Sequence, residues 1–198
     1  MKVINLIGGP CCGKSTTAAG LFSYIKLHCN NSVELVTEVV KDYGYDRNQS
    51  AMEDQVLMTA EQNHKIRRLI PQGIEFAVTD ASLLNGIVYG QHYDIDDGDV
   101  VQDMVHGLFH KYDNVVFLLP RKPHYDAYGR SQSEEEAMVI DDRMVEALDF
   151  NGIEYYDMRA HKHTELPVAI AEILVNNHGL VLKDTESFGN IAFGKPIC

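Results

Sequence analysis

The chain carries Gly8-Gly9-Pro10-Cys11-Cys12-Gly13-Lys14-Ser15-Thr16 near its N-terminus. The first eight residues match the pattern G-x-x-x-x-G-K-[ST] at every fixed position. Glycines in such a loop let the backbone curl, so that successive N–H groups point at phosphate oxygens. The first turn of the following helix adds its own free N–H groups and the positive end of its dipole. We therefore predict that residues 8–16 bind the phosphates of a nucleoside triphosphate.

The segments on either side of this loop fit the same interpretation. An apolar strand is expected over 3–7 and an amphipathic helix over 14–29, which is the strand–loop–helix context that the pattern requires. Lys14 is then expected to reach the β- and γ-phosphates, and the Ser15 hydroxyl to ligate Mg²⁺. A glycine turn that happens to precede Lys-Ser is the alternative, and the flanking elements argue against it. Cys11 and Cys12 are interpreted as small fillers, although a thiol at a helix N-terminus can be oxidisable.

The remaining sequence alternates short β-branched runs with amphipathic stretches, which is typical of a parallel sheet with crossover helices. The pattern predicts an α/β, three-layer P-loop fold with a five-stranded, mostly parallel sheet flanked by helices. Residues 1–178 are expected to form one domain, with a lid at about 120–136 and an unassigned tail at 179–198. Further strands are expected at 33–37, 74–79, 115–119 and 153–157, and further helices at 51–70, 101–112, 137–148 and 166–175.

Composition narrows the classes of partner. The net charge of −12 argues against duplex DNA and anionic membranes, because both attract a basic surface. There is no apolar run long enough to span a bilayer and no signal-peptide pattern, so a cytoplasmic location is expected. The four cysteines lack metal-ligand spacing and are expected to be free thiols. The oligomeric state, including a homo-oligomer, stays open.

Two acidic residues follow predicted strands. Asp80 ends the third strand, at the carboxyl edge where doubly wound sheets bind ligands, and it is a candidate to hold Mg²⁺ through water. Glu38 follows the second strand at the same edge and is a candidate general base for an attacking hydroxyl. A helix cap for Asp80 and a lone surface glutamate for Glu38 are the alternatives.

Cations gather after the fourth strand in an otherwise acidic chain. Arg121, Lys122 and Arg130 precede the next helix, and Arg143 lies on it. Arginine suits phosphate because its fork of donors matches the phosphate oxygens, so a closing lid with Arg130 is predicted. The alternative is a solvated loop whose arginines pair with Glu134–Glu136. The amide side chains on the long helix (Gln55, Gln62, Asn63) either hydrogen-bond the ring edge of an acceptor or are exposed to solvent.

In this order, the segments resemble the small P-loop kinases related to the ribosylnicotinamide kinase domain of bifunctional NAD-salvage proteins. They are also similar to compact ATP-binding proteins encoded by bacteriophages. The likeness runs from residue 1 to about 175 and is carried by 8–16, 34–38, 54–55 with 61–63, 78–80 and 128–132. It implies an ATP-dependent kinase with Mg²⁺ in which Glu38 is the base, Asp80 the acid on the metal side and Arg130 the lid cation. The two loop cysteines and the aspartate-rich segment 93–100 depart from it.

The function expected from the sequence is transfer of the γ-phosphate of ATP to a hydroxyl or phosphate of a small nucleoside or nucleotide. Two alternatives remain at this stage. One is a kinase of a hydroxylated base already in DNA, against which the acidic charge weighs. The other is a regulator that binds a nucleotide without transferring its phosphate.

Overall fold

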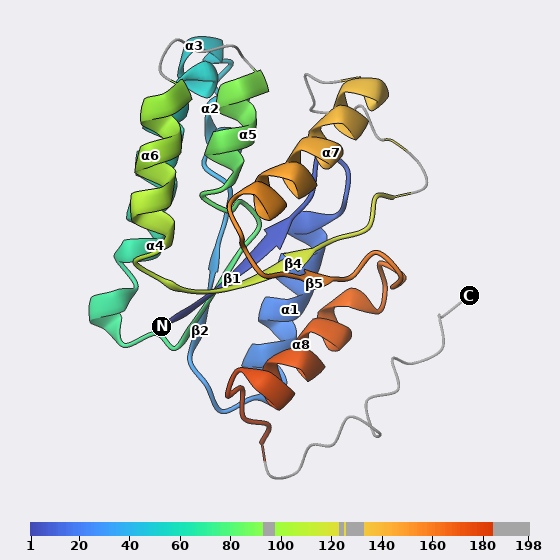
Figure 1. Ribbon diagram of the computed structural model, residues 1–198. Helices are drawn as coiled ribbons and strands as arrows, with labels where there is room; N and C mark the ends of the chain where they lie inside the picture. Colours follow the sequence, from blue (N-terminus) through green and yellow to red (C-terminus); the bar gives the residue numbers. More distant parts are fainter. Residues whose placement is uncertain (93–97, 123–124, 126–132, 184–198) are drawn as a thin grey trace.

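A computed structural model describes residues 1–92, 98–122, 125 and 133–183 of the chain. Within these residues five strands form a single sheet in the order β2-β3-β1-β4-β5, and every strand pair is parallel (Figure 1). The three-layer α/β fold and the five-stranded sheet expected from the sequence are confirmed. The strands are β1 (Lys2–Ile7), β2 (Val33–Val36), β3 (Phe76–Thr79), β4 (Asp113–Leu118) and β5 (Tyr156–Asp157).

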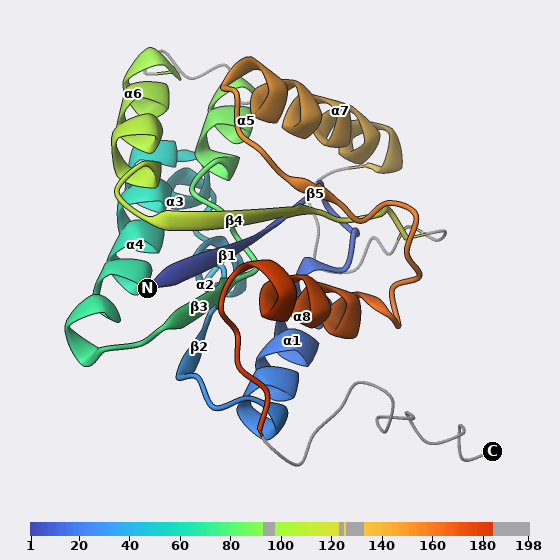
Figure 2. The same ribbon diagram turned by 60° about the horizontal axis from the view of Figure 1, so that its bottom comes forward.

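Helices cover both faces of this sheet, and each face has its own apolar core (Figure 2). Alternate residues of a strand point to opposite faces, so Ile4 and Leu6 join one core while Val3 and Ile7 join the other. The first face carries α1 (Lys14–His28) and α8 (Leu166–Asn177), which pack against each other. The second face carries α4 (Gln55–Arg67), α5 (Asn85–His92), α6 (Gly98–Phe109) and α7 (Glu134–Phe150).

The region between β2 and β3 differs from the expectation of one long helix over 51–70. It forms α2 (Val40–Tyr45), α3 (Gln49–Glu53), α4 and a short 3₁₀ helix, η1 (Ile70–Gln72). Asp54 causes the break between α3 and α4, because its extended backbone stops one helix while its carboxylate accepts the N–H of Leu57 and caps the next. Neither α2 nor α3 contains a buried residue.

Helix α5 is the other element absent from the sequence-based expectation. Its two glycines, Gly86 and Gly90, weaken its helical pattern. The packing explains Gly86, because a Cβ there would lie 2.5 Å from the Thr59 Oγ1 of α4. The glycine therefore lets α4 and α5 approach closely, and both helices border the cavity described below.

The start of the predicted tail packs on the domain. Leu180 is buried in the core formed by α1 and α8, and Leu182 forms an isolated antiparallel bridge with Cys29. Residues 184–198 lie outside the described part of the chain, so the boundary after 178 stays a prediction. None of the helices in the described ranges is both long and apolar enough to cross a bilayer.

Candidate functional site

The loop between β1 and α1 has the conformation that its glycines allow. Gly8 has φ 148° and Gly13 has φ 78°, values that favour glycine, and a Cβ at Gly8 would lie 2.7 Å from Cys12 Sγ. Cys11 also has a positive φ of 68°, which is uncommon outside glycine and is often found at functional loops. The Lys14 ammonium donates to the carbonyl oxygens of Gly8 (2.6 Å) and Gly9 (2.8 Å). The loop thus places Lys14 and the N-terminus of α1 on one concave surface.

A second layer of contacts holds the outer side of the loop. Asp141 of α7 accepts the N–H of Gly9 at 2.6 Å, and Arg121 donates to the carbonyl of Pro10 at 3.2 Å. Arg121 and Asp141 also form an ion pair, and Arg121 donates to the Ala137 carbonyl at 2.6 Å. The sequence had left Arg121 open between phosphate and Glu134–Glu136, whereas the structure pairs it with Asp141.

The other cations of the predicted lid are only partly described. Lys122 lies beside the loop, because a Cβ at Gly13 would be 3.1 Å from its Cε. Arg143 has a buried Nη1 without a hydrogen-bond partner in the described ranges. Arg130 lies outside the described residues, as do 123–124 and the rest of 126–132, so the lid and the role of Arg130 stay predictions.

Glu38 and Asp80 lie at one edge of the sheet, as the order of elements predicted. Val36 at the end of β2 pairs with Thr79 at the end of β3, which brings the residues that follow each strand together. The Asp80 carboxylate is buried, and its Oδ1 accepts the N–H of Glu38 at 2.8 Å. The backbone of Glu38 is therefore held by Asp80, and its side chain lines the same cavity as Lys14.

Lys41 joins this edge from the first turn of α2. Its Nζ lies 2.5 Å from Ser15 Oγ, 2.9 Å from Asp80 Oδ2 and 3.6 Å from Glu38 Oε2. Three oxygen atoms from three segments of the chain thus surround one ammonium group. The sequence had singled out the three oxygen-bearing residues, and it had suggested for Lys41 only a part in ordering the acceptor.

The environment of Glu38 favours its protonated form. Removal from water raises the pKa of its carboxyl above the ordinary range, and the nearby Asp80 charge acts in the same direction. The charges of Lys14 and Lys41 oppose this shift without cancelling it. A carboxylate with a raised pKa accepts a proton more readily, which is the property that a general base requires.

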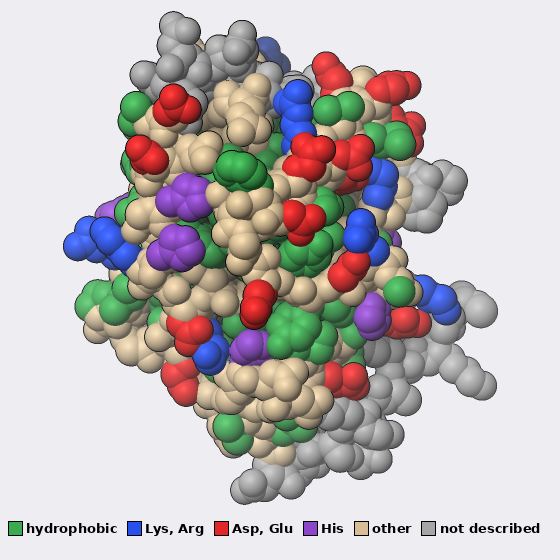
Figure 3. All heavy atoms as spheres, in the orientation of Figure 1, with side chains coloured by type: hydrophobic (Ala, Val, Ile, Leu, Met, Phe, Trp, Pro, Cys, Tyr) green, Lys and Arg blue, Asp and Glu red, His purple; other side chains and the backbone are tan. Residues whose placement is uncertain are grey.

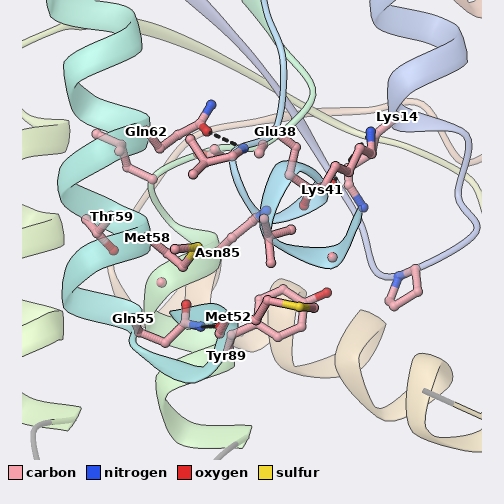
Figure 4. A pocket seen from close by; sticks show the side chains of 18 of the residues that line it. Lys14, Glu38, Lys41, Met52, Gln55, Met58, Thr59, Gln62, Asn85 and Tyr89 are labelled. Carbon is pink, nitrogen blue, oxygen red and sulfur yellow. Dashed lines mark hydrogen bonds and ion pairs between the residues drawn. The ribbon is translucent and has the colours of Figure 1, made fainter. Parts of the chain in front are cut away.

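A cavity of about 720 Å³ extends from the loop toward α4 and α5. Figure 4 shows Lys14, Glu38 and Lys41 at one end and Met52, Gln55 and Tyr89 at the other. The second end combines thioethers and a phenol ring with neutral amides, a composition suited to a planar polar ring. Other lining residues include Pro10, Val39, Arg47, Met58, Thr59, Gln62, Leu83 and Asn85.

Polar groups of this cavity differ in whether the protein already satisfies them. Gln62 is buried and structural, because it accepts the N–H of Val39 and donates to the Thr79 hydroxyl. Thr59 is also buried, yet its Oγ1 has no partner in the described part of the chain, and the same holds for Asn85 Oδ1. Buried polar atoms are rarely left without a hydrogen bond. These two atoms are therefore candidates to contact a ligand, and neither was found from the sequence.

The oxygen atoms around Lys41 Nζ fit a magnesium ion. Mg²⁺ prefers oxygen ligands and is usually held by one or two carboxylates together with substrate phosphates. Ser15 and Asp80 provide a hydroxyl and a buried carboxylate beside the loop, and the geometry already accommodates a positive charge there. Within the described ranges, no three or more His, Cys, Asp or Glu side chains lie close enough together to hold a metal ion. A site in this part of the chain would therefore need other ligands as well, such as the Ser15 hydroxyl.

His163 is a further residue that sequence patterns did not reveal. It precedes α8, and its Nδ1 would lie 3.2 Å from a Cβ on Gly13. Both of its ring nitrogens are buried and lack partners within the described residues. His163 therefore lies against the phosphate-binding loop.

Acidic side chains are frequent along α7, whose first turn is Glu134, Glu135 and Glu136. Red side chains gather at the upper right of Figure 3, where α7 lies, with a few Lys and Arg side chains among them. Such a concentration of negative charge disfavours contact with polyanions at this helix.

These features define a class. P-loop nucleotide-binding proteins are characterised by three features that this chain has. These are a parallel α/β sheet, a strand–loop–helix with the pattern G-x-x-x-x-G-K-S, and two acidic residues at the adjacent edge of the sheet. Residues 3–165 match the family described as AAA domain, and the chain belongs to that family. No curated protein sequence matches it.

Solved structures with the same fold include nucleoside and nucleotide kinases. A NadR protein in complex with NR has a TM-score of 0.71 at 17% identity over 94% of this chain. This chain spans 54% of that protein, about half its length. Deoxyadenosine kinase from M. mycoides has a TM-score of 0.59 at 16% identity, covering 89% of this chain and 100% of the kinase. Thymidylate kinase from Ehrlichia chaffeensis has a TM-score of 0.64 at 12% identity, covering 87% and 98%. At these identities the likeness establishes the fold.

Proposed function

We propose that this protein is a phosphotransferase that moves the γ-phosphoryl group of ATP to a hydroxyl or phosphate of a small nucleoside or nucleotide. One observation carries the proposal: Lys14 of the phosphate-binding loop and the carboxylate of Glu38 line the same cavity as the amide, thioether and phenol side chains of Gln55, Met52 and Tyr89. A protein that only bound ATP would have no need of a second pocket opening onto the γ-phosphate position.

Residues at the two ends of the cavity have different proposed roles. The loop N–H groups and Lys14 bind the phosphates of the donor, while the neutral end of the cavity holds the ring of the acceptor. The acceptor oxygen attacks the γ-phosphorus as the bond to the β–γ bridging oxygen breaks, and ADP leaves. If the acceptor is a hydroxyl, its proton passes to Glu38.

The acceptor end is built to hold a ring in one orientation. Met52 and Tyr89 offer flat or pliable apolar surfaces, and Gln55, Thr59 and Asn85 offer polar atoms. Positioning the acceptor in this way supplies much of the rate, because phosphoryl transfer depends chiefly on alignment and on stabilising charge.

Ser15 and Asp80 would hold Mg²⁺, which when bound neutralises charge on the β- and γ-phosphate oxygens. Arg130 is proposed to add a further cation from the lid, on the strength of the sequence pattern alone. Water exclusion by that lid would prevent hydrolysis of ATP.

The structural neighbours support this class of acceptor. They include a NadR protein in complex with NR, and a deoxyadenosine kinase with bound dATP or with the products dCMP and a flexible dCDP. Each is a protein of this fold associated with a nucleoside or nucleotide. The identity of this chain's own acceptor follows from none of them.

An acceptor screen tests the proposal. Purified protein, radiolabelled ATP and Mg²⁺ are incubated with nucleosides, nucleoside monophosphates and nicotinamide riboside, and labelled products are separated. We expect one acceptor group to be labelled, and Lys14→Met to abolish the labelling. Tight ATP binding without labelling of any small acceptor would contradict the proposal and favour a regulator. A parallel reaction with DNA containing hydroxymethylated bases separates the DNA-kinase alternative.

A further inference from the structure

Lys41 holds a position that its sequence context does not explain. It lies in the first turn of α2, and its ammonium reaches back to the N-terminus of α1 and across to the end of β3. Its Nζ contacts Ser15 Oγ at 2.5 Å and Asp80 Oδ2 at 2.9 Å. These are the two residues whose oxygen atoms fit Mg²⁺.

A magnesium ion and this ammonium group cannot share one position. Both would take the same oxygen atoms, and two positive charges a few ångströms apart repel strongly in a partly buried site. Binding of the metal therefore requires Lys41 to leave Ser15 and Asp80. The Lys41 side chain is 41% exposed and its long stem has many rotamers, so it can turn toward solvent or the cavity, whereas Asp80 is 3% exposed and enclosed by the protein.

The backbone that carries Lys41 is held on both sides of it. Asp80 and Gln62 hold the N–H groups of Glu38 and Val39, immediately before α2. On α2 itself, Asp42 pairs with Lys65 and the Tyr43 hydroxyl donates to Glu61 at 2.7 Å. Rotation of the partly exposed Lys41 side chain therefore repositions its ammonium without disturbing the backbone of Glu38.

The destination of the released ammonium follows from the cavity. Lys41 lines it together with Lys14 and Glu38, at the end next to the phosphate-binding loop. Once Mg²⁺ is bound by Ser15 and Asp80, Lys41 can no longer contact their oxygen atoms. The group with the greatest negative charge on this side of the cavity is then the γ-phosphate of the bound triphosphate.

We propose that Lys41 is a second phosphate-binding cation, which holds the Ser15–Asp80 site in the metal-free protein and transfers to the γ-phosphate when Mg²⁺ binds. This inference rests on the proposed function for the presence of a triphosphate, and it requires no particular acceptor. A lysine that only filled a surface ion pair would affect neither metal nor phosphate. A lysine that only blocked the metal would affect the metal alone.

Two binding measurements on Lys41→Met separate these cases. Affinity for Mn²⁺, a paramagnetic substitute for Mg²⁺, is measured by electron spin resonance in the presence of ADP. The ratio of affinities for a non-hydrolysable β,γ-imido analogue of ATP and for ADP, both with Mg²⁺, is measured by calorimetry. Methionine keeps most of the length of the side chain and removes its charge and hydrogen bonds.

We expect Mn²⁺ to bind about tenfold more tightly to the variant, because a competing charged hydrogen bond has been removed. We expect the preference for the γ-phosphate analogue over ADP to fall by about tenfold as well. Lys41→Arg should restore part of that preference, since a cation returns.

Lys26→Met is the matched control. Lys26 also forms an ion pair, with Glu34, is exposed to a similar extent and lies outside the residues that line the cavity. It should change neither quantity. Unaltered Mn²⁺ affinity in Lys41→Met would overturn the metal half of the inference, and an unaltered analogue preference would overturn the phosphate half. A chain that phosphorylates no acceptor at all would refute the proposed function and leave both measurements valid.

Discussion

Replacing Glu38 with glutamine tests the assignment of the general base. The variant keeps the shape of the side chain and loses its charge. The backbone contact survives, because it is the N–H of Glu38 that donates to Asp80 at 2.8 Å. The substitution therefore alters the chemistry at the site without moving the backbone that follows β2.

Two effects of different size follow. Loss of a general base lowers turnover by about 10²- to 10⁴-fold. Loss of the 3.6 Å ion pair with Lys41, which is partly exposed, costs about 1 kcal/mol or less, which corresponds to about fivefold in binding at most. The turnover number for a hydroxyl acceptor should therefore fall far more than the affinity for ATP.

The pH dependence supplies a second signature. Burial raises the pKa of the Glu38 carboxyl, so wild-type activity should fall as pH drops through that raised pKa, and the variant should lack this limb. A raised pKa in the folded protein means that protonated Glu38 favours folding. That contribution is present below the unfolded pKa and is lost as pH rises through the folded one. Above the folded pKa, glutamine removes a partly desolvated charge, so the melting temperature should not fall there.

The assay is steady-state transfer from labelled ATP between pH 5 and pH 9, with thermal unfolding alongside. Glu34→Gln is the control, because it removes the same charge from an exposed position on β2, where Glu34 pairs with Lys26. Its turnover should stay within about twofold of wild type. Turnover of Glu38→Gln within tenfold of wild type, with the acidic limb retained, would refute Glu38 as the base.

Three further predictions concern the loop, the acceptor pocket and the contacts that hold the loop. Gly8→Ala should weaken ATP binding, measured by calorimetry, by about tenfold or more. The added Cβ would lie 2.7 Å from Cys12 Sγ, and residue 8 has a φ of 148°, which disfavours alanine. Unchanged affinity would contradict the described loop. Thr59→Val should raise the acceptor KM by about tenfold without lowering the melting temperature, since its buried Oγ1 has no partner in the described ranges. A drop in stability with unchanged KM would instead make Thr59 structural. Arg121→Ala should lower the free energy of unfolding by about 1–2 kcal/mol in urea titrations, because it leaves Asp141 without its ion pair, and Arg121→Lys should recover only part of this.

The loop could be predicted from the sequence because its properties are local. A strand, a glycine pattern and a helix follow one another within 2–28, and each contributes its part without help from distant residues. Placing Glu38 and Asp80 together needed one further rule, that parallel strands end at the same edge of their sheet. The register of β2 with β3 bears that expectation out.

The cavity could not be predicted in the same way. Its neutral end is formed by α3, α4 and α5, and the glycines of α5 conceal that helix from a reading of periodicity. A glycine is needed at position 86 because α4 approaches α5 closely there, through Thr59. The break at Asp54 was not predicted, because the extended backbone and the cap that make it a boundary are seen only in the structure.

The sequence by itself therefore determined the P-loop, the parallel α/β fold and the acids at the sheet edge, because each depends on short-range patterns or on the direction of parallel strands. Tertiary structure alone decided what surrounds them. It brought Lys41 to Ser15 and Asp80, Asp141 to Gly9, and His163 to Gly13. These pairs are between 26 and 150 residues apart in sequence, and their contacts follow from how helices and loops pack on the sheet.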